Sequence, residues 1–150
     1  RLDIFHQPCD VNALATAALY HDASEILTGD LPTPIKYHNA EIMSAYHAVE
    51  DLAVQKLLGM LPPELRGTYA DVLAEDKDGD IYPLVKAADK LSAYIKCIEE
   101  RKAGNNEFLS AEAQTRAALE ASPLPEVQYF LEHFIPAFER DLDELGAIGQ

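Results

Sequence analysis

Apolar residues recur along most of this chain at spacings of three and four, the period of an amphipathic α-helix. No run alternates apolar and polar residues with a period of two, so the pattern predicts helices and no strands. Capping residues, glycines and prolines divide the pattern into separate segments. The fold class predicted is all-α, with helices expected at residues 11–28, 42–57, 63–73, 83–103, 110–121 and 125–145.

Three of these helices have boundaries or faces that the structure can test. Asp10 is expected to cap the first helix and Gly29 to end it, and Pro136 is expected to kink the last. The first helix is also expected to lie in the core, because it is apolar on nearly all sides. The residues predicted to face inward are Leu84, Ala88, Leu91, Ile95 and Ile98 in the fourth helix, and Val127, Phe130, Leu131, Phe134, Phe138 and Leu142 in the last.

Charge and composition narrow the functions that such a helical protein could have. The 150 residues, about one domain, carry a formal charge of −14 with only 12 lysines and arginines, which argues against binding a nucleic acid polymer. No apolar stretch approaches the roughly 20 residues that span a bilayer, so no membrane partner is expected. The two cysteines, Cys9 and Cys97, form no disulfide framework and favour a reducing, cytoplasmic setting.

The first helix contains an ionisable cluster in its apolar run. His21 and Glu25 are four residues apart and Asp22 and Glu25 are three apart, so on a helix all three can face one side. Asp89 lies in a second apolar helix. Carboxylates and a histidine entering a core need partners, and a divalent cation is one. From spacing alone, a solvated helix end and a metal site both remain open.

A second acidic segment, residues 76–80 with the sequence DKDGD, begins like a calcium-binding loop of the EF-hand type. Such a loop needs Gly at its sixth position and Glu at its twelfth. Counted from Asp76, those positions hold Ile81 and Ala87. The segment is therefore interpreted as a solvated turn.

Three segments of the sequence closely resemble a known family. They are YHDASEILTGDLPTPIKY at 20–37, LVKAADKLSAYIKCIEE at 84–100 and AGNNEFL at 103–109. In this order they are similar to the bacterial HD-domain 5′-deoxynucleotidases, the YfbR-like group. The resemblance implies an all-α HD-domain helical bundle of the HD phosphohydrolase superfamily, with residues 1–150 as a single HD domain.

The resemblance also implies roles for individual residues. His21, Asp22 and Asp89 match the family's metal ligands, and Glu25 matches its catalytic carboxylate. The cofactor implied is a divalent cation, cobalt or manganese. The positions implied to contact substrate are Asp22, Asp30, Leu31, Pro32, Thr33 and Asp89.

The activity implied is metal-dependent hydrolysis of deoxyribonucleoside 5′-monophosphates to deoxynucleoside and phosphate, by a cytoplasmic homodimer. The family's first metal histidine lies on an earlier helix that these residues do not match, so an N-terminal helical segment carrying it is expected outside them. Two alternatives stay open: an HD phosphohydrolase of another nucleotide, and a catalytically dead helical module that binds a nucleotide or a partner.

Overall fold

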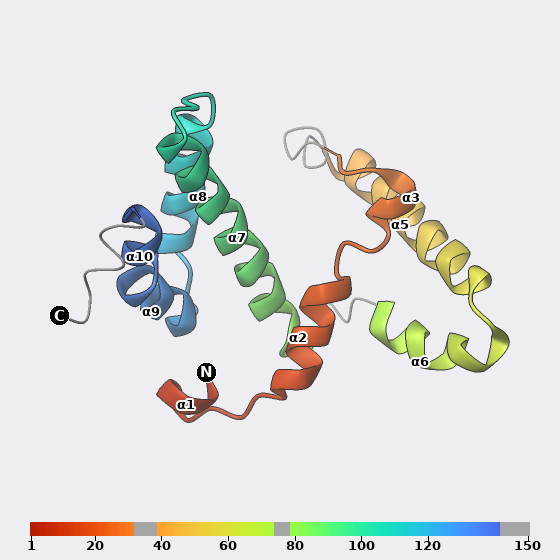
Figure 1. The fold of residues 1–150 in the computed structure, drawn as a ribbon. Helices are drawn as coiled ribbons and strands as arrows, with labels where there is room; N and C mark the ends of the chain where they lie inside the picture. The colour runs from red at the N-terminus through yellow and green to blue at the C-terminus, as the bar shows by residue number, and fades with distance from the viewer. Residues whose placement is uncertain (32–38, 74–78, 142–150) are drawn as a thin grey trace. The chain divides into compact units, whose positions relative to one another are not determined.

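The computed structural model describes residues 1–31, 39–73 and 79–141, and within these ranges its regular structure is helical throughout (Figure 1). The all-α prediction is confirmed for this part of the chain. The chain divides into two compact units. Unit 2 comprises Asp10–Val85, and unit 1 comprises Arg1–Cys9 together with Lys86–Gln150.

Unit 2 is built from helices that contact one another in pairs: α2 packs on α6, α3 on α5, and α5 on α6. Side-chain caps begin two of them. Asp10 accepts hydrogen bonds from the backbone N–H groups of Asn12 and Ala13, both at 3.0 Å, and Asn39 accepts one from Ile42 at 2.8 Å. These caps satisfy amide groups that have no partner inside the helix. The helices are α2 (Val11–Tyr20), α3 (Glu25–Thr28), α5 (Ala40–Met60) and α6 (Pro63–Leu73).

The first predicted helix is interrupted between α2 and α3. The backbone N–H groups of Ala23 and Glu25 donate to the carbonyls three residues earlier, at 2.9 Å each, which tightens the chain into turns. The ring of His21 contacts the Ala18 carbonyl at 2.8 Å, so a side chain occupies an oxygen that a continuing helix would use. The prediction of one continuous helix is therefore wrong at residues 21–24.

The burial predicted for the first helix is also wrong in the described structure. No residue of α2 is buried, and Leu19 is 78% exposed. The reason is that unit 2 has little interior of its own: in α5, which is 21 residues long, only Ala53 is buried. An apolar sequence predicts a buried helix only where other elements cover it.

Unit 1 contains the main hydrophobic core. Its helices are α1 (Leu2–Phe5), α8 (Leu109–Glu120), α9 (Pro125–His133), α10 (Ile135–Glu139) and α7 (Tyr82–Lys102), whose first four residues belong to unit 2. The buried members of the core are Tyr94, Ile98, Leu119, Val127 and Ile135, with Ala87, Leu91, Ile95, Leu124, Phe130, Leu131 and Phe138 packed against them.

The inward face of α7 departs from its predicted stripe at two positions. Tyr94 is buried and Ala88 is exposed, whereas Leu91, Ile95 and Ile98 face the core as expected. Burial raises the pKa of the Tyr94 hydroxyl, because the low-dielectric interior disfavours the phenolate. The positive charge of Arg116 acts in the opposite direction and lowers this pKa, so the hydroxyl lies near a charged group.

The last predicted helix is divided where a kink was expected. Helix α9 ends at His133 and α10 begins at Ile135, because Pro136 has no N–H and its ring conflicts with the preceding turn. Phe134, at the break, stacks on Phe130 with ring centroids 5.0 Å apart and is 50% exposed. Its predicted inward position is therefore wrong, while Val127 is buried as predicted. Leu142 lies outside the described residues.

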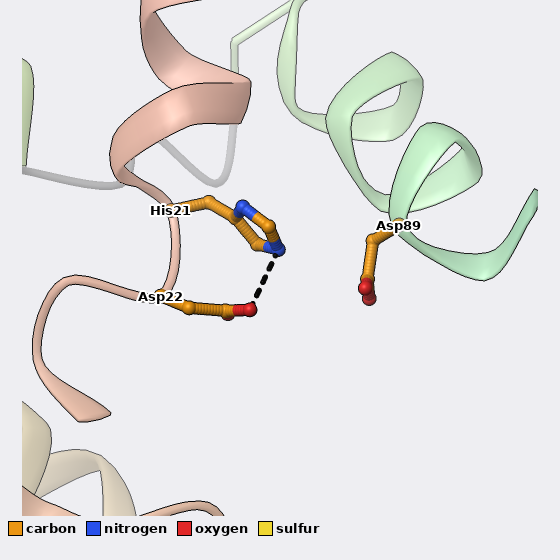
Figure 2. Close-up of side chains that lie close together, drawn as sticks. All are labelled: His21, Asp22 and Asp89. Carbon is orange, nitrogen blue, oxygen red and sulfur yellow. Dashed lines mark ion pairs between the residues drawn. The ribbon is translucent and has the colours of Figure 1, made fainter. Parts of the chain in front are cut away.

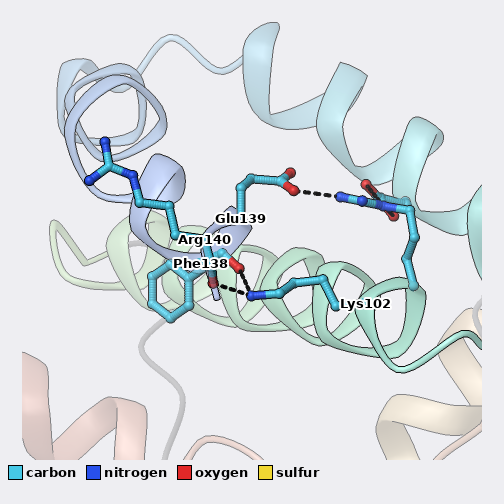
Figure 3. A network of polar contacts seen from close by, with 6 residues as sticks. Lys102, Phe138, Glu139 and Arg140 are labelled. Carbon is cyan, nitrogen blue, oxygen red and sulfur yellow. Dashed lines mark hydrogen bonds and ion pairs between the residues drawn. The ribbon is translucent and has the colours of Figure 1, made fainter. Parts of the chain in front are cut away.

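Charged side chains fasten α10 and α8 to the end of α7. The Arg101 guanidinium lies 3.0 Å from a carboxylate oxygen of Glu112 and 2.7 Å from one of Glu139. These hydrogen bonds raise the pKa of Arg101. The ammonium group of Lys102 donates to the backbone carbonyls of Phe138, at 2.9 Å, and Arg140 (Figure 3). A cation thereby satisfies carbonyls at the end of α10 that have no partner within the helix.

Both cysteines, Cys9 and Cys97, are free thiols, as their number and spacing predicted. Burial raises the pKa of Cys97, which therefore has little thiolate character near neutral pH.

No helix within the described ranges is long and apolar enough to cross a bilayer.

Candidate metal centre

His21 and Asp22 are adjacent residues in the turn that separates α2 from α3. The His21 side chain is 17% exposed and that of Asp22 is 52% exposed, so the imidazole is sheltered while the carboxylate meets solvent. The turn begins after α2 ends at Tyr20, and hydrogen bonds between residues three positions apart close it. Both side chains therefore leave the chain at one corner of unit 2.

The hydrogen bond of His21 fixes which ring nitrogen faces Asp22. The Nδ1–H group donates to the Ala18 carbonyl at 2.8 Å, which leaves the lone pair on Nε2. Figure 2 shows this nitrogen facing the Asp22 carboxylate, with Nε2 and Oδ2 3.1 Å apart. Unless the ring carries a second proton, both atoms are acceptors, and a cation beside them would make the contact favourable. Metal-binding histidines are held in this way, by donation from their second nitrogen.

Glu25 opens α3, three residues after Asp22. Its backbone N–H donates to the Asp22 carbonyl at 2.9 Å, so the two carboxylate residues belong to one turn. Glu25 is partly buried, and Ser24 before it is buried. The local structure thus keeps His21, Asp22 and Glu25 in one short segment, although the path is a turn and not the continuous helix predicted.

Asp89 lies elsewhere, in the second turn of α7, with an exposed side chain. It belongs to unit 1, whereas His21, Asp22 and Glu25 belong to unit 2. Its predicted role as a metal ligand stays a prediction. The alternative acidic segment that resembled a calcium loop falls largely on residues 74–78, outside the described residues.

The segment predicted to contact substrate begins where α3 ends. Asp30 is exposed and Leu31 is partly buried, and both follow Gly29 directly. Pro32 and Thr33, the remaining members of the prediction, lie outside the described residues. The Gly29 carbonyl accepts a hydrogen bond from the hydroxyl of Tyr46, on α5, at 3.2 Å.

Tyr46 falls within the second predicted helix, at residues 42–57. Nothing in a sequence period indicates that a tyrosine hydroxyl 17 residues away will reach a glycine carbonyl, so this contact was missed.

A second tyrosine contact supports α2 beside the histidine. Tyr20 and Tyr69 meet edge to face with ring centroids 6.1 Å apart, and a hydrogen bond with Tyr69 raises the pKa of Tyr20.

Comparison with known proteins identifies relatives along nearly the whole chain. A family model described as 5′-deoxynucleotidase YfbR-like matches residues 1–138. Two relatives are each 52% identical to this chain over 140 residues. They are the proteins named 5′-deoxynucleotidase YfbR from Shigella flexneri serotype 5b and from Escherichia coli K12/DH10B. Each match covers 91% of this chain and 70% of the relative.

A solved structure agrees with these sequence relatives. The crystal structure of an HD-domain phosphohydrolase from Listeria innocua matches this fold with a TM-score of 0.76 at 26% sequence identity. The match covers 91% of this chain and 67% of that one. The fold predicted from the sequence, an HD-domain helical bundle, is therefore confirmed. With a family model over residues 1–138 and relatives at 52% identity, this chain belongs to the YfbR-like 5′-deoxynucleotidase family.

Proposed function

We propose that this protein is a metal-dependent 5′-nucleotidase, which hydrolyses deoxyribonucleoside 5′-monophosphates to the deoxynucleoside and inorganic phosphate. Family membership supports the reaction class, because the relatives are named 5′-deoxynucleotidases. The structural observation that carries the proposal is the orientation of His21. Its Nδ1–H is engaged by Ala18, and its Nε2 faces the carboxylate of Asp22 3.1 Å away.

The proposed metal ligands are His21, Asp22 and Asp89. They offer one imidazole nitrogen and two carboxylate oxygens, a donor set that suits manganese, cobalt and other divalent transition metals. In this proposal Asp89, on α7, completes the set of ligands. A divalent cation held there would supply Lewis-acid activation of water and offset the charge of the phosphate.

Glu25 is the proposed general acid–base residue. It lies one turn after the two ligands of unit 2, and a carboxylate in that position can orient a water molecule and accept its proton as the phosphate is attacked. Glu25 is outside the proposed ligand set, so its role in proton transfer is separate from metal binding. The leaving group in this reaction is the 5′-oxygen of the nucleoside.

The remaining contacts to substrate are proposed at the metal carboxylates and in the segment after α3. Asp22 and Asp89 would bind substrate through the ion they hold. Asp30 and Leu31, followed by Pro32 and Thr33, would lie against the sugar and phosphate. Asp30 is exposed, which leaves its carboxylate accessible to a ligand.

Three protein ligands leave room for a fourth, and we propose that a histidine outside the 150 residues supplies it. The family pattern implied by the resemblance contains such a histidine on an earlier helix. The curated relatives are longer than the matched region, since the match covers 70% of their length. The 150 residues alone are therefore expected to bind metal weakly and to hydrolyse nucleotides negligibly.

A turnover assay on the full-length protein tests this function. Phosphate release is measured for deoxyribonucleoside and ribonucleoside 5′-monophosphates and for cyclic and polyphosphorylated nucleotides, each with manganese, cobalt or a chelator. Metal-dependent turnover of the deoxynucleoside monophosphates is expected. Preference for another phosphate ester would leave an HD phosphohydrolase of different specificity. No turnover, with all four ligands present, would leave a binding module.

We also propose that the active protein is a cytoplasmic homodimer. Its free cysteines suit a reducing compartment, and its proposed substrates belong to the nucleotide pool. Exposed apolar side chains such as Phe134 and Leu52, which are 50% and 69% exposed, offer surface for association. Light scattering on the full-length protein should give twice the monomer mass, and a monomer mass would contradict the dimer.

A further inference from the structure

The carbonyl oxygen of Gly29 accepts hydrogen bonds from two hydroxyl groups of different origin. One donor is local: the Thr28 hydroxyl lies 2.9 Å away. The other is distant in sequence: the Tyr46 hydroxyl of α5 lies 3.2 Å away. Only the second bond ties the end of α3 to another element, so the direction of the chain after Gly29 depends on α5.

Gly29 is the point where the chain changes direction. Its φ of 70° and ψ of 160° fall in a region that is open almost exclusively to glycine. Its backbone N–H donates to the Glu25 carbonyl at 2.9 Å and closes α3. Gly29 thus contacts Glu25 through its N–H, and its carbonyl, which accepts from Tyr46, begins the segment of Asp30 and Leu31.

The surroundings give this contact a defined geometry. Helix α3 packs on α5, within a single unit, so the tyrosine approaches from a neighbouring helix (Figure 1). Tyr46 is partly buried, as is Thr28, and Ser24 at the start of α3 is buried. A rigid aromatic side chain with two rotatable bonds loses little entropy when its hydroxyl forms a hydrogen bond.

We infer that Tyr46 is a positioning residue for substrate, which acts by fixing the start of the Asp30–Leu31 segment relative to Glu25. The inference rests on the proposed function, in which Asp30 and Leu31 contact the sugar and phosphate. Tyr46 touches neither metal nor substrate in this account. Loss of its hydroxyl is expected to leave the metal ligands and Glu25 in place and to loosen the segment that orients the nucleotide.

The test is Tyr46→Phe in the full-length protein, which removes the hydroxyl and keeps the ring. The expected result is a KM for deoxyadenosine 5′-monophosphate raised about 3- to 10-fold, the range of one neutral hydrogen bond. The kcat should stay within about twofold of the parent value, because the substitution weakens nucleotide binding and leaves the chemical step unchanged. Manganese affinity and melting temperature should match the parent protein. Tyr129→Phe is the matched control, since this tyrosine of α9 packs in the other unit, against Phe5.

Hydrogen–deuterium exchange gives a second readout that does not depend on activity. Peptides covering residues 26–31 should exchange faster in Tyr46→Phe and at the parent rate in Tyr129→Phe. An unchanged KM in an active enzyme, or unchanged exchange, overturns the inference and leaves the proposed function standing. A fall in kcat together with loss of manganese binding also overturns it, because Tyr46 would then support the metal ligands. An inactive parent protein refutes the proposed function, and with it the substrate role of Tyr46.

Discussion

At the scale of single residues, the direction of the His21 ring decides what its neighbourhood can bind. Donation from Nδ1 to the Ala18 carbonyl leaves one lone pair, and the Asp22 carboxylate stands opposite it. The same bond occupies a carbonyl that a continuing helix would have used, so the interruption of the helix and the orientation of the ligand have one cause.

Glu25→Gln in the full-length protein should lower kcat by about 10²- to 10⁴-fold, because the amide cannot accept the proton. Manganese binding, measured by calorimetry, should be retained, since Glu25 is not a proposed ligand. Glu41→Gln, at an exposed position in the first turn of α5, is the control and should keep full activity. A Glu25→Gln rate within two- or threefold of the parent rate would remove this residue from the mechanism.

Gly29→Ala should destabilise the protein by roughly 1–3 kcal/mol, the cost of placing a side chain in this backbone region. The cause is conformational alone, because a Cβ at Gly29 would meet nothing within 4 Å. Gly67→Ala is the matched control: it also meets nothing, lies within helix α6 and should stabilise by about 0.5–1 kcal/mol. Urea unfolding of both variants measures the difference, and equal stabilities would contradict the argument.

At the scale of helices, each unit is stabilised in a different way. Unit 1 has a buried core and a charged junction, in which Arg101 of α7 contacts Glu112 of α8 and Glu139 of α10. Unit 2 relies on capped helices with few buried side chains. Helices with so little buried surface open more readily than those around a core.

Arg101→Lys should lower the free energy of unfolding. An ammonium group cannot reproduce the planar set of donors that reaches two carboxylates at once. Lys96→Gln removes the ion pair of Lys96 with Glu100, four residues away on the same helix, and should lower stability less than Arg101→Lys does. Urea titrations followed by circular dichroism compare the two. Equal effects would mean that Arg101 contributes no more than a surface pair.

At the scale of the whole molecule, the proposed metal ligands come from both units, His21 and Asp22 from unit 2 and Asp89 from unit 1. An ion that binds all three would bind only the assembled protein. Its binding free energy would then add to the stability of the complete fold.

Manganese at about 100 times its Kd should therefore raise the free energy of unfolding of the full-length protein by about 2.7 kcal/mol. Asp89→Asn should lose most of this gain, whereas Asp80→Asn, which changes an exposed carboxylate just before α7, should retain it. Thermal unfolding with and without the metal measures both. If Asp89→Asn keeps the full gain, Asp89 is not a ligand.

The sequence by itself determined where most helices begin and end, and it identified the family. Proline, glycine and capping residues act on their immediate neighbours, so the start of α6 at Pro63, the cap at Asp10 and the end of α3 at Gly29 could be predicted. The residue types at His21, Asp22 and Glu25, with their short spacing, left a metal site and a solvated helix end both open, and the family resemblance favoured the metal site.

Only the tertiary structure decided which faces are buried and which polar groups meet. Tyr94 is buried where α7, α8, α9 and α10 meet, and Leu19 stays exposed because no described element covers it. Tyr46 reaches Gly29 because α5 packs on α3. Periodicity records how apolar a position is and carries no information about its partner, because the partner is brought close by packing between segments that are distant in sequence.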